Sequence, residues 1–80
     1  MIPIYGFLEG DTIGLLILAD EQELLAATAA KLQAAARLRA GLAGPLAVFV
    51  NGRPVELDAT VQQAGIKALD RVDVRRGAPR

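Results

Sequence analysis

The longest patterned stretch of the sequence is a helical repeat over residues 21–39, EQELLAATAAKLQAAARLR. Apolar and small residues recur there at spacings of three and four, which places them on one face of an α-helix. That face carries Leu25, Thr28, Ala29, Leu32, Ala35, Ala36 and Arg39. Asp20 is the predicted N-cap, with Glu23 as its capping-box partner. Gly41 and Gly44 predict the C-cap and the following loop.

The flanking segments have the pattern of strands joined by turns. Residues 1–8 (MIPIYGFL) and 12–19 (TIGLLILA) predict a first hairpin around the turn Glu9-Gly10-Asp11. Residues 46–50 (LAVFV) and 53–57 (RPVEL) predict a second hairpin. Asn51-Gly52 between them is a strong signal for a two-residue type I′ turn.

The C-terminal part predicts two short turns and a last strand. Asp58-Ala59-Thr60 opens a short helical turn over residues 61–64, which Gly65 stops, and residues 67–70 form another turn. In residues 71–75 (RVDVR), Val72 and Val74 alternate with charged residues, so the valines face inward and Asp73 faces outward.

The predicted order is strand, strand, helix, strand, strand, short turn, strand. The last strand needs partners on both sides, and a place between the first and third strands supplies them. The predicted fold class is therefore α+β, a β-grasp (ubiquitin-like) mixed five-stranded sheet with one long helix across one face. Residues 1–75 form this single domain, and residues 76–80 are predicted to be a flexible C-terminal tail.

One helix covers one face of such a sheet, and the first hairpin is apolar on both faces. If Ile2 and Ile4 face the helix, the side chains that face outward are Pro3, Tyr5, Phe7, Leu16 and Leu18. An exposed apolar patch indicates a docking surface for a protein partner. A loop or the tail folded over this face is one alternative, and a homodimer paired through the first hairpin is another.

The predicted partner-binding residues are four from the first hairpin and two from the last strand: Tyr5, Phe7, Leu16, Leu18, Arg71 and Arg75. Together with Arg76, the two arginines form a small basic strip. The ordinary interpretation is that this strip is a solvated edge of the sheet, and the alternative is that it binds an acidic partner. Glu9 and Asp11 resemble a pair of carboxylates but fit a solvated turn better.

Composition removes most catalytic chemistry. The 80 residues include no Cys and no His, which excludes thiolate or His-ligated metal sites, cysteine nucleophiles and histidine-based triads. Thr12, Thr28 and Thr60 remain as nucleophiles, and none stands beside an obvious base. We therefore predict no enzyme activity, no catalytic residue and no cofactor or metal site.

Charge and hydropathy bound the partners and the location. Nine basic residues balance nine acidic ones, so the net charge does not call for nucleic acid or a membrane surface. The longest apolar run, residues 13–19, is far shorter than the ~20 residues of a membrane span. No signal peptide is visible, and we expect a cytoplasmic protein.

Several segments together resemble a known family. They are Ile2-Pro3, the turn Glu9-x-Asp11, Leu18-Ala19-Asp20, Lys31 late in the helix, and residues 58–66 (DATVQQAGI) followed by residues 70–74 (DRVDV). In order and spacing they resemble the toluene monooxygenase B family, over nearly the whole chain. The sequence departs from that pattern in its alanine-rich helix and its basic tail.

The resemblance implies a ubiquitin-like fold and a role as the small gamma subunit of a bacterial multicomponent di-iron aromatic monooxygenase. It also implies tight docking on the large oxygenase subunit, which holds the di-iron centre. A ubiquitin-like modifier or sulfur carrier is the alternative from another class. Those proteins need a tail that ends in Gly-Gly, whereas here Gly77 is followed by Ala78-Pro79-Arg80. A stand-alone ubiquitin-like interaction module is a further alternative.

Overall fold

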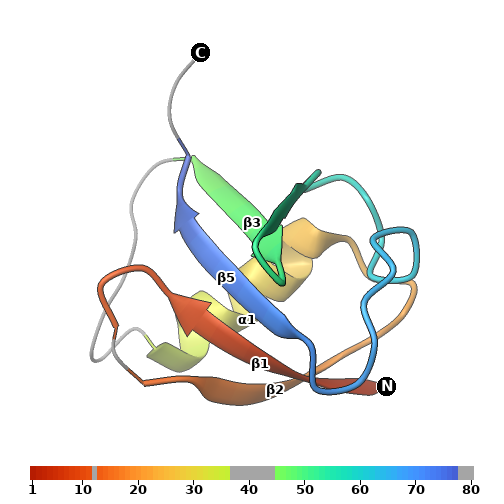
Figure 1. The fold of residues 1–80 in the computed structure, drawn as a ribbon, viewed down its shortest axis with the longest axis horizontal. Coiled ribbons are helices and arrows are strands. Elements are labelled where there is room, and N and C mark those ends of the chain that lie inside the picture. The colour runs from red at the N-terminus through yellow and green to blue at the C-terminus, as the bar shows by residue number, and fades with distance from the viewer. Residues whose placement is uncertain (12, 37–44, 78–80) are drawn as a thin grey trace.

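The structure, a computed structural model, describes residues 1–11, 13–36 and 45–77. One sheet and one helix make up the fold, and the helix crosses behind the sheet in the view of Figure 1. The elements are β1 Ile2–Leu8, β2 Leu15–Ala19, α1 Leu25–Ala36, β3 Leu46–Val50, β4 Arg53–Val55 and β5 Arg71–Arg76. The sheet order is β2-β1-β5-β3-β4, with β1 and β5 parallel and the other neighbours antiparallel. The predicted β-grasp topology, with the last strand between the first and third, is confirmed.

The second hairpin has the predicted turn. Asn51 and Gly52 have φ angles of 51° and 85°, and positive φ at both central positions defines a type I′ turn. Asn51 also joins the turn to β5, because its backbone N–H donates to the Arg71 carbonyl at 2.8 Å and its side-chain oxygen accepts from the Arg71 N–H at 3.1 Å. The turn therefore fixes the start of β5 as well as the pairing of β3 with β4.

The core lies between α1 and one face of the sheet, as the alternation of the strands predicts. Its buried side chains include Ile4, Leu8, Leu25, Ala29, Leu32, Val48, Val50, Val72 and Val74. Helix and sheet lie close together at Gly6, where an added Cβ would lie 2.7 Å from Leu32 Cδ1. The absence of a side chain at Gly6 therefore sets how deeply α1 can pack.

The helix begins four residues later than predicted. Asp20 and Glu23 do exchange hydrogen bonds, because the Asp20 N–H donates to Glu23 Oε1 at 2.9 Å and the Glu23 N–H donates to the Asp20 carbonyl at 3.0 Å. These bonds close a separate turn before the helix. The first helical N–H groups, those of Leu25 and Ala26, instead donate to the carbonyls of Ala59 and Leu57, at 2.9 and 3.0 Å. The helix start is capped from the loop after β4, which local sequence patterns do not reveal.

Other boundaries shift by a few residues. β2 begins at Leu15, β4 ends at Val55, and β5 continues to Arg76. The predicted helical turn after Thr60 is a short hydrogen-bonded turn, in which the N–H groups of Ala64 and Gly65 donate to the carbonyls of Thr60 and Gln62, both at 3.0 Å. Ala35, predicted on the buried stripe of α1, is exposed. The predictions for Thr12, for residues 37–44 and for residues 78–80 lie outside the described residues.

Candidate functional site

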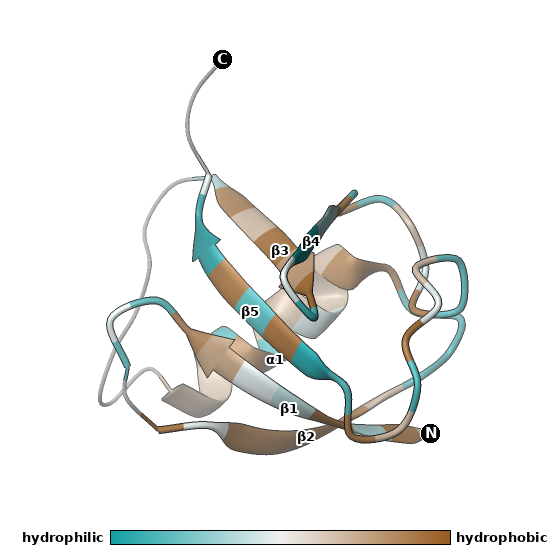
Figure 2. Ribbon diagram, in the orientation of Figure 1, coloured by the Kyte–Doolittle hydropathy of each residue, from teal (hydrophilic) through white to brown (hydrophobic). Residues whose placement is uncertain are grey.

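The outer face of the sheet, opposite α1, carries an exposed apolar patch formed by Tyr5, Leu16 and Leu18. Strand pairing places Tyr5 directly opposite Leu16, and Pro3 opposite Leu18. Tyr5 is 45% exposed, Leu16 59% and Leu18 53%. Figure 2 shows the same contrast, because β2 is hydrophobic along its length whereas β5 alternates. No segment within the described residues covers these three side chains, as their exposure shows.

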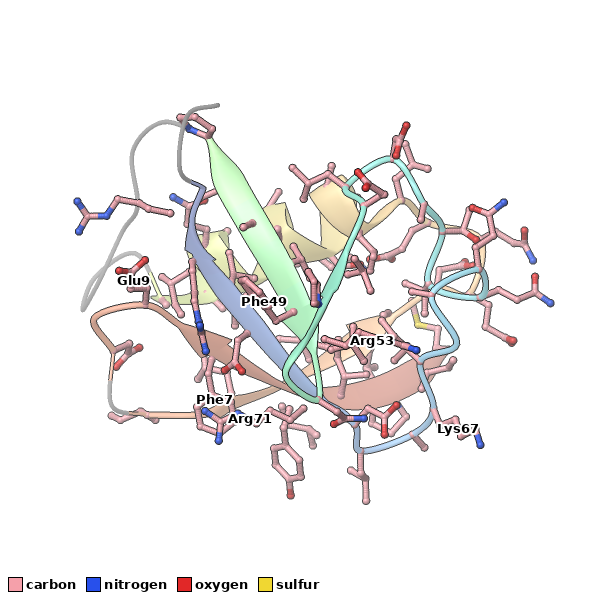
Figure 3. The ribbon with its side chains drawn as sticks, turned by 45° about the horizontal axis from the view of Figure 1, so that its top comes forward. Phe7, Glu9, Phe49, Arg53, Lys67 and Arg71 are labelled. Atoms are coloured by element: carbon pink, nitrogen blue, oxygen red, sulfur yellow. The ribbon has the colours of Figure 1, made fainter. Side chains whose placement is uncertain are left out.

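Phe7 lies on the same face but is half-buried. The guanidinium carbon of Arg71 lies 4.1 Å from the centroid of the Phe7 ring (Figure 3). Gly14 approaches the same ring so closely that an added Cβ would come within 2.6 Å of it. Arg71 and Gly14 therefore cover part of the ring, which stays partly exposed.

A cluster of three charged residues, Arg71, Asp73 and Arg75, continues the outer face along β5. Asp73 is only 7% exposed although it points away from the core. Its Oδ1 accepts from Arg71 Nε at 3.1 Å, and its Oδ2 lies 3.9 Å from an Arg75 terminal nitrogen. The Arg75 guanidinium lies 4.7 Å from the centroid of the Phe49 ring. Asp73 is thus covered by two arginines, each of which stacks on an aromatic ring.

The structure brings five of the six predicted partner-binding residues together. Tyr5 pairs with Leu16 on one side and with Arg71 on the other, and Phe7 and Leu18 adjoin them. Arg75 lies farther along β5, opposite Ala47 of β3. Sequence reasoning missed Asp73 and Phe49 as members of this surface. The signal was present in the alternation Arg-x-Asp-x-Arg of one strand and the aromatic residues of its neighbours.

Glu9 and Asp11 do not act as a pair. The Glu9 Oε1 accepts from the backbone N–H of Arg76 at 2.7 Å, which joins the first turn to the end of β5. The Asp11 Oδ1 accepts from the Ile13 N–H at 3.2 Å. Both carboxylates hold the hairpin turn in place, in agreement with the turn interpretation.

The threonine hydroxyls within the described residues have structural roles. Thr60 Oγ1 accepts from the Gln63 N–H at 3.0 Å, and the Thr60 N–H donates to Gln63 Oε1 at 2.9 Å, which makes a reciprocal cap for the turn after Thr60. Thr28 Oγ1 donates to Glu23 Oε2 at 2.5 Å, next to the core. Thr12 lies outside the described residues.

The pKa of the Glu23 carboxyl is lowered in the folded chain. Burial by itself would raise the pKa of Glu23. Hydrogen bonds from Lys31, Thr28 and the Asp20 N–H, together with the positive charge of Lys31, outweigh that effect and lower the pKa below its ordinary value of 4.5. This carboxylate is therefore held ionised between the turn and the helix, where it stabilises the fold.

The described residues contain neither a cluster of metal-binding side chains nor a membrane-spanning helix. No three acidic side chains gather there in a way that could hold a metal ion. A helix long and apolar enough to cross a membrane does not occur in the described ranges, where α1 spans 12 residues.

Comparisons with known proteins agree with this fold. No curated protein sequence matches the chain. A structure named "Toluene 4 monooxygenase HD Complex with Inhibitor 4-Bromobenzoate" contains a chain that superposes with a TM-score of 0.86 at 18% identity, over 95% of this chain and 98% of that one. A ubiquitin of Caldiarchaeum subterraneum superposes with a TM-score of 0.75 at 15% identity, over 98% of this chain and 95% of that one.

At such low identities these superpositions show the shared ubiquitin-like fold. The family follows from the sequence itself, because residues 1–75 match the model of toluene-4-monooxygenase system protein B, TmoB. The match spans nearly the whole chain and includes the first hairpin, α1 and all but the last residue of β5. The chain is therefore a member of the toluene-4-monooxygenase system protein B family, an accessory component of a monooxygenase system.

Proposed function

We propose that this protein is a non-catalytic subunit that docks on the large subunit of a bacterial di-iron aromatic monooxygenase through the outer face of its sheet. The observation that carries the proposal is the exposed apolar patch of Tyr5, Leu16 and Leu18 on a face that α1 does not cover. Membership of the TmoB family supports a monooxygenase component as the assembly that this face joins.

The composition of the patch suits a protein interface. Two leucines about half exposed, beside a tyrosine, supply apolar area that docking would remove from water. Tyrosine and arginine are enriched among the residues that carry binding energy at interfaces, and Arg71 borders the patch. The charged cluster on β5 would form the polar border of such an interface.

The polar residues of the chain support a non-catalytic role. Glu9, Glu23, Thr28 and Thr60 hold turns and the helix by the hydrogen bonds described above. We assign the oxygen chemistry and the di-iron centre to the large subunit, as the family resemblance implies. The contribution of this chain would be to stabilise or shape that subunit.

The test is co-purification of the chain with the large oxygenase subunit, with Leu16→Asp as the disrupting variant. Leu24→Asp is the matched control, since Leu24 is also an exposed leucine (45%) but lies beside the start of α1. We expect the wild-type chain and Leu24→Asp to bind and Leu16→Asp to lose at least about 10-fold in affinity, because a charge would be buried without a partner. Equal binding by all three, or no binding by the wild type, would refute the proposal.

An assembly of two copies through β2 is a second candidate, because β2 is an edge strand of the sheet with exposed leucines. Sedimentation of the chain by itself separates the candidates. A monomer favours the oxygenase interface, whereas a dimer that Leu16→Asp dissociates would favour pairing between copies.

A further inference from the structure

We propose that Arg71 is the polar anchor of the outer face and that it binds a carboxylate side chain, from an aspartate or a glutamate, on the partner protein. The proposal rests on docking through the outer face and specifies what the partner must present there. The partner surface is expected to place one carboxylate over Arg71, beside apolar side chains that cover Tyr5 and Leu16.

The Arg71 side chain is already held in one place. Its guanidinium stacks on Phe7 with the carbon 4.1 Å from the ring centroid. Its Nε lies 3.1 and 3.3 Å from the two carboxylate oxygens of Asp73. Its backbone is fixed by the two hydrogen bonds with Asn51. An arginine held in this way loses little conformational freedom when it binds, which favours affinity.

The bonds described for the Arg71 side chain use Nε alone. The two terminal nitrogens carry four further N–H groups, and the side chain is 57% exposed. Their planar arrangement matches the two oxygens of a carboxylate and permits a pair of parallel charge-assisted hydrogen bonds. The geometry therefore presents a donor pair that is oriented in advance and open to solvent.

The cluster on β5 contains two arginines and one aspartate, so these three side chains leave one arginine charge for a partner carboxylate to pair with. The carboxylates of Glu9 and Asp11 line the same hollow, so it is the exposure of the Arg71 side chain, rather than the wider charge balance, that favours it as the anchor. Arg75 lies 3.9 Å from Asp73, a longer and weaker contact than that of Arg71, and it is farther from the apolar patch. Arg71 is therefore the better anchor of the two.

The surroundings favour a protein carboxylate over the phosphates of a nucleic acid. Nucleic-acid surfaces require an array of basic groups, whereas the whole chain has a net charge of zero and buries Asp73 beside Arg71. Tyr5, opposite Arg71 in the strand pairing, and Leu16 beyond it are apolar neighbours. When docking excludes water from such neighbours, an ion pair among them becomes stronger.

The experiment measures binding of the wild type, Arg71→Gln, Arg71→Lys and Lys67→Gln to the purified large oxygenase subunit over a range of salt concentrations. Lys67→Gln is the matched control, because it removes the same charge from an exposed turn that lies apart from Arg71 in Figure 3. We expect Arg71→Gln to lower affinity by about 10- to 100-fold and to flatten the salt dependence. Arg71→Lys should restore only part of the affinity, and Lys67→Gln should change it by less than about 2-fold.

The outcomes separate this inference from the proposed function. If the wild type binds and Leu16→Asp does not, while Arg71→Gln binds like the wild type, the anchor is refuted and the docking face stands. A loss in Arg71→Gln with an unchanged salt dependence would assign the effect to packing on Phe7 and would also refute the anchor. Full recovery in Arg71→Lys would refute the paired hydrogen bonds. If the wild type does not bind the subunit, the proposed function fails first.

Discussion

Lys31 Nζ lies 2.6 Å from Glu23 Oε1 and 3.0 Å from the carbonyl oxygen of Leu18. Through this one ammonium group, the helix is joined both to the turn before it and to the edge strand β2. Glu23 is 13% exposed in this arrangement, and its second oxygen accepts from Thr28. The pair therefore connects three parts of the fold at a partly buried position.

The pKa shift of Glu23 predicts a pH-dependent contribution to stability. Because the pKa is lower in the folded than in the unfolded chain, the contribution is fully present above the ordinary value of 4.5 and is lost as the pH falls through the folded-state pKa. Glu23→Gln should lower the free energy of unfolding at pH 7 by about 1–2 kcal/mol and make it less dependent on pH in the acidic range. Urea unfolding at a series of pH values measures both effects.

Glu21→Gln serves as the control for that series, since Glu21 is an exposed acid two residues earlier. Its stability and pH dependence should follow the wild type. An unchanged pH profile in Glu23→Gln would show that this carboxylate does not contribute in the way proposed.

Gly6→Ala should destabilise the protein by about 1–3 kcal/mol, because the new methyl group would meet the buried Leu32 side chain at 2.7 Å. The double variant Gly6→Ala, Leu32→Ala should lose less free energy of unfolding than the sum of the losses in the two single variants. The difference, which is the coupling energy, should be about 1 kcal/mol. Thermal or urea unfolding of the two single variants and the double variant provides the measurement. Strict additivity would mean that the close approach at Gly6 is not what limits helix packing.

Leu69→Gly should stabilise the chain although it removes an apolar side chain. Leu69 has a φ of 66° and is 56% exposed, so it adopts a left-handed conformation with little burial in return. Relief of that conformation is expected to stabilise the folded chain by about 1 kcal/mol. The greater conformational entropy of glycine in the unfolded chain offsets part of this gain. The midpoint of urea unfolding should rise slightly, whereas Ala68→Gly, the exposed neighbour, should lower it. A lower midpoint for Leu69→Gly would contradict the explanation.

Two charge substitutions on the outer face should differ in their effects on the isolated chain. Leu16→Asp should change the free energy of unfolding by less than about 0.5 kcal/mol, because Leu16 is 59% exposed. Phe7→Asp should lower the free energy of unfolding by about 1–3 kcal/mol. The Phe7 ring lies between Arg71 and Gly14, and its removal would leave a void there. Circular dichroism during thermal unfolding distinguishes the two. Similar melting temperatures for the two variants would show that the Phe7 side chain contributes as little to packing as that of Leu16.

The sequence predicted the sheet well because the signals for it are local. Asn51-Gly52 specifies its turn by conformation alone, and the alternation of residues 71–75 identifies which side of the last strand is buried. The apolar outer face of the first hairpin was also predictable, because neither of its strands, residues 2–8 and 15–19, contains a charged residue on either face. Local patterning thus defines most of this fold and the position of its exposed patch.

Features that depend on distant segments were not predictable. The helix start was placed too early because Asp20 and Glu23 have the pattern of a cap, whereas the groups that cap the helix come from Leu57 and Ala59. Asp73 faces outward as expected, but its burial was not predicted, because it depends on two arginines that stack on Phe7 and Phe49. Each of these arrangements joins residues that no short window of sequence contains.

The capping of α1 from a distant loop has a consequence for how the chain folds during synthesis. A 12-residue helix is marginal by itself, and here the first two N–H groups of α1 find their acceptors only once residues 57–59 have joined it. The ribosome must therefore release more than twenty further residues before the helix that it has already made can be completed. We expect a late, cooperative folding step rather than a helix that waits preformed, and a nascent chain that ends before residue 57 should remain largely unstructured.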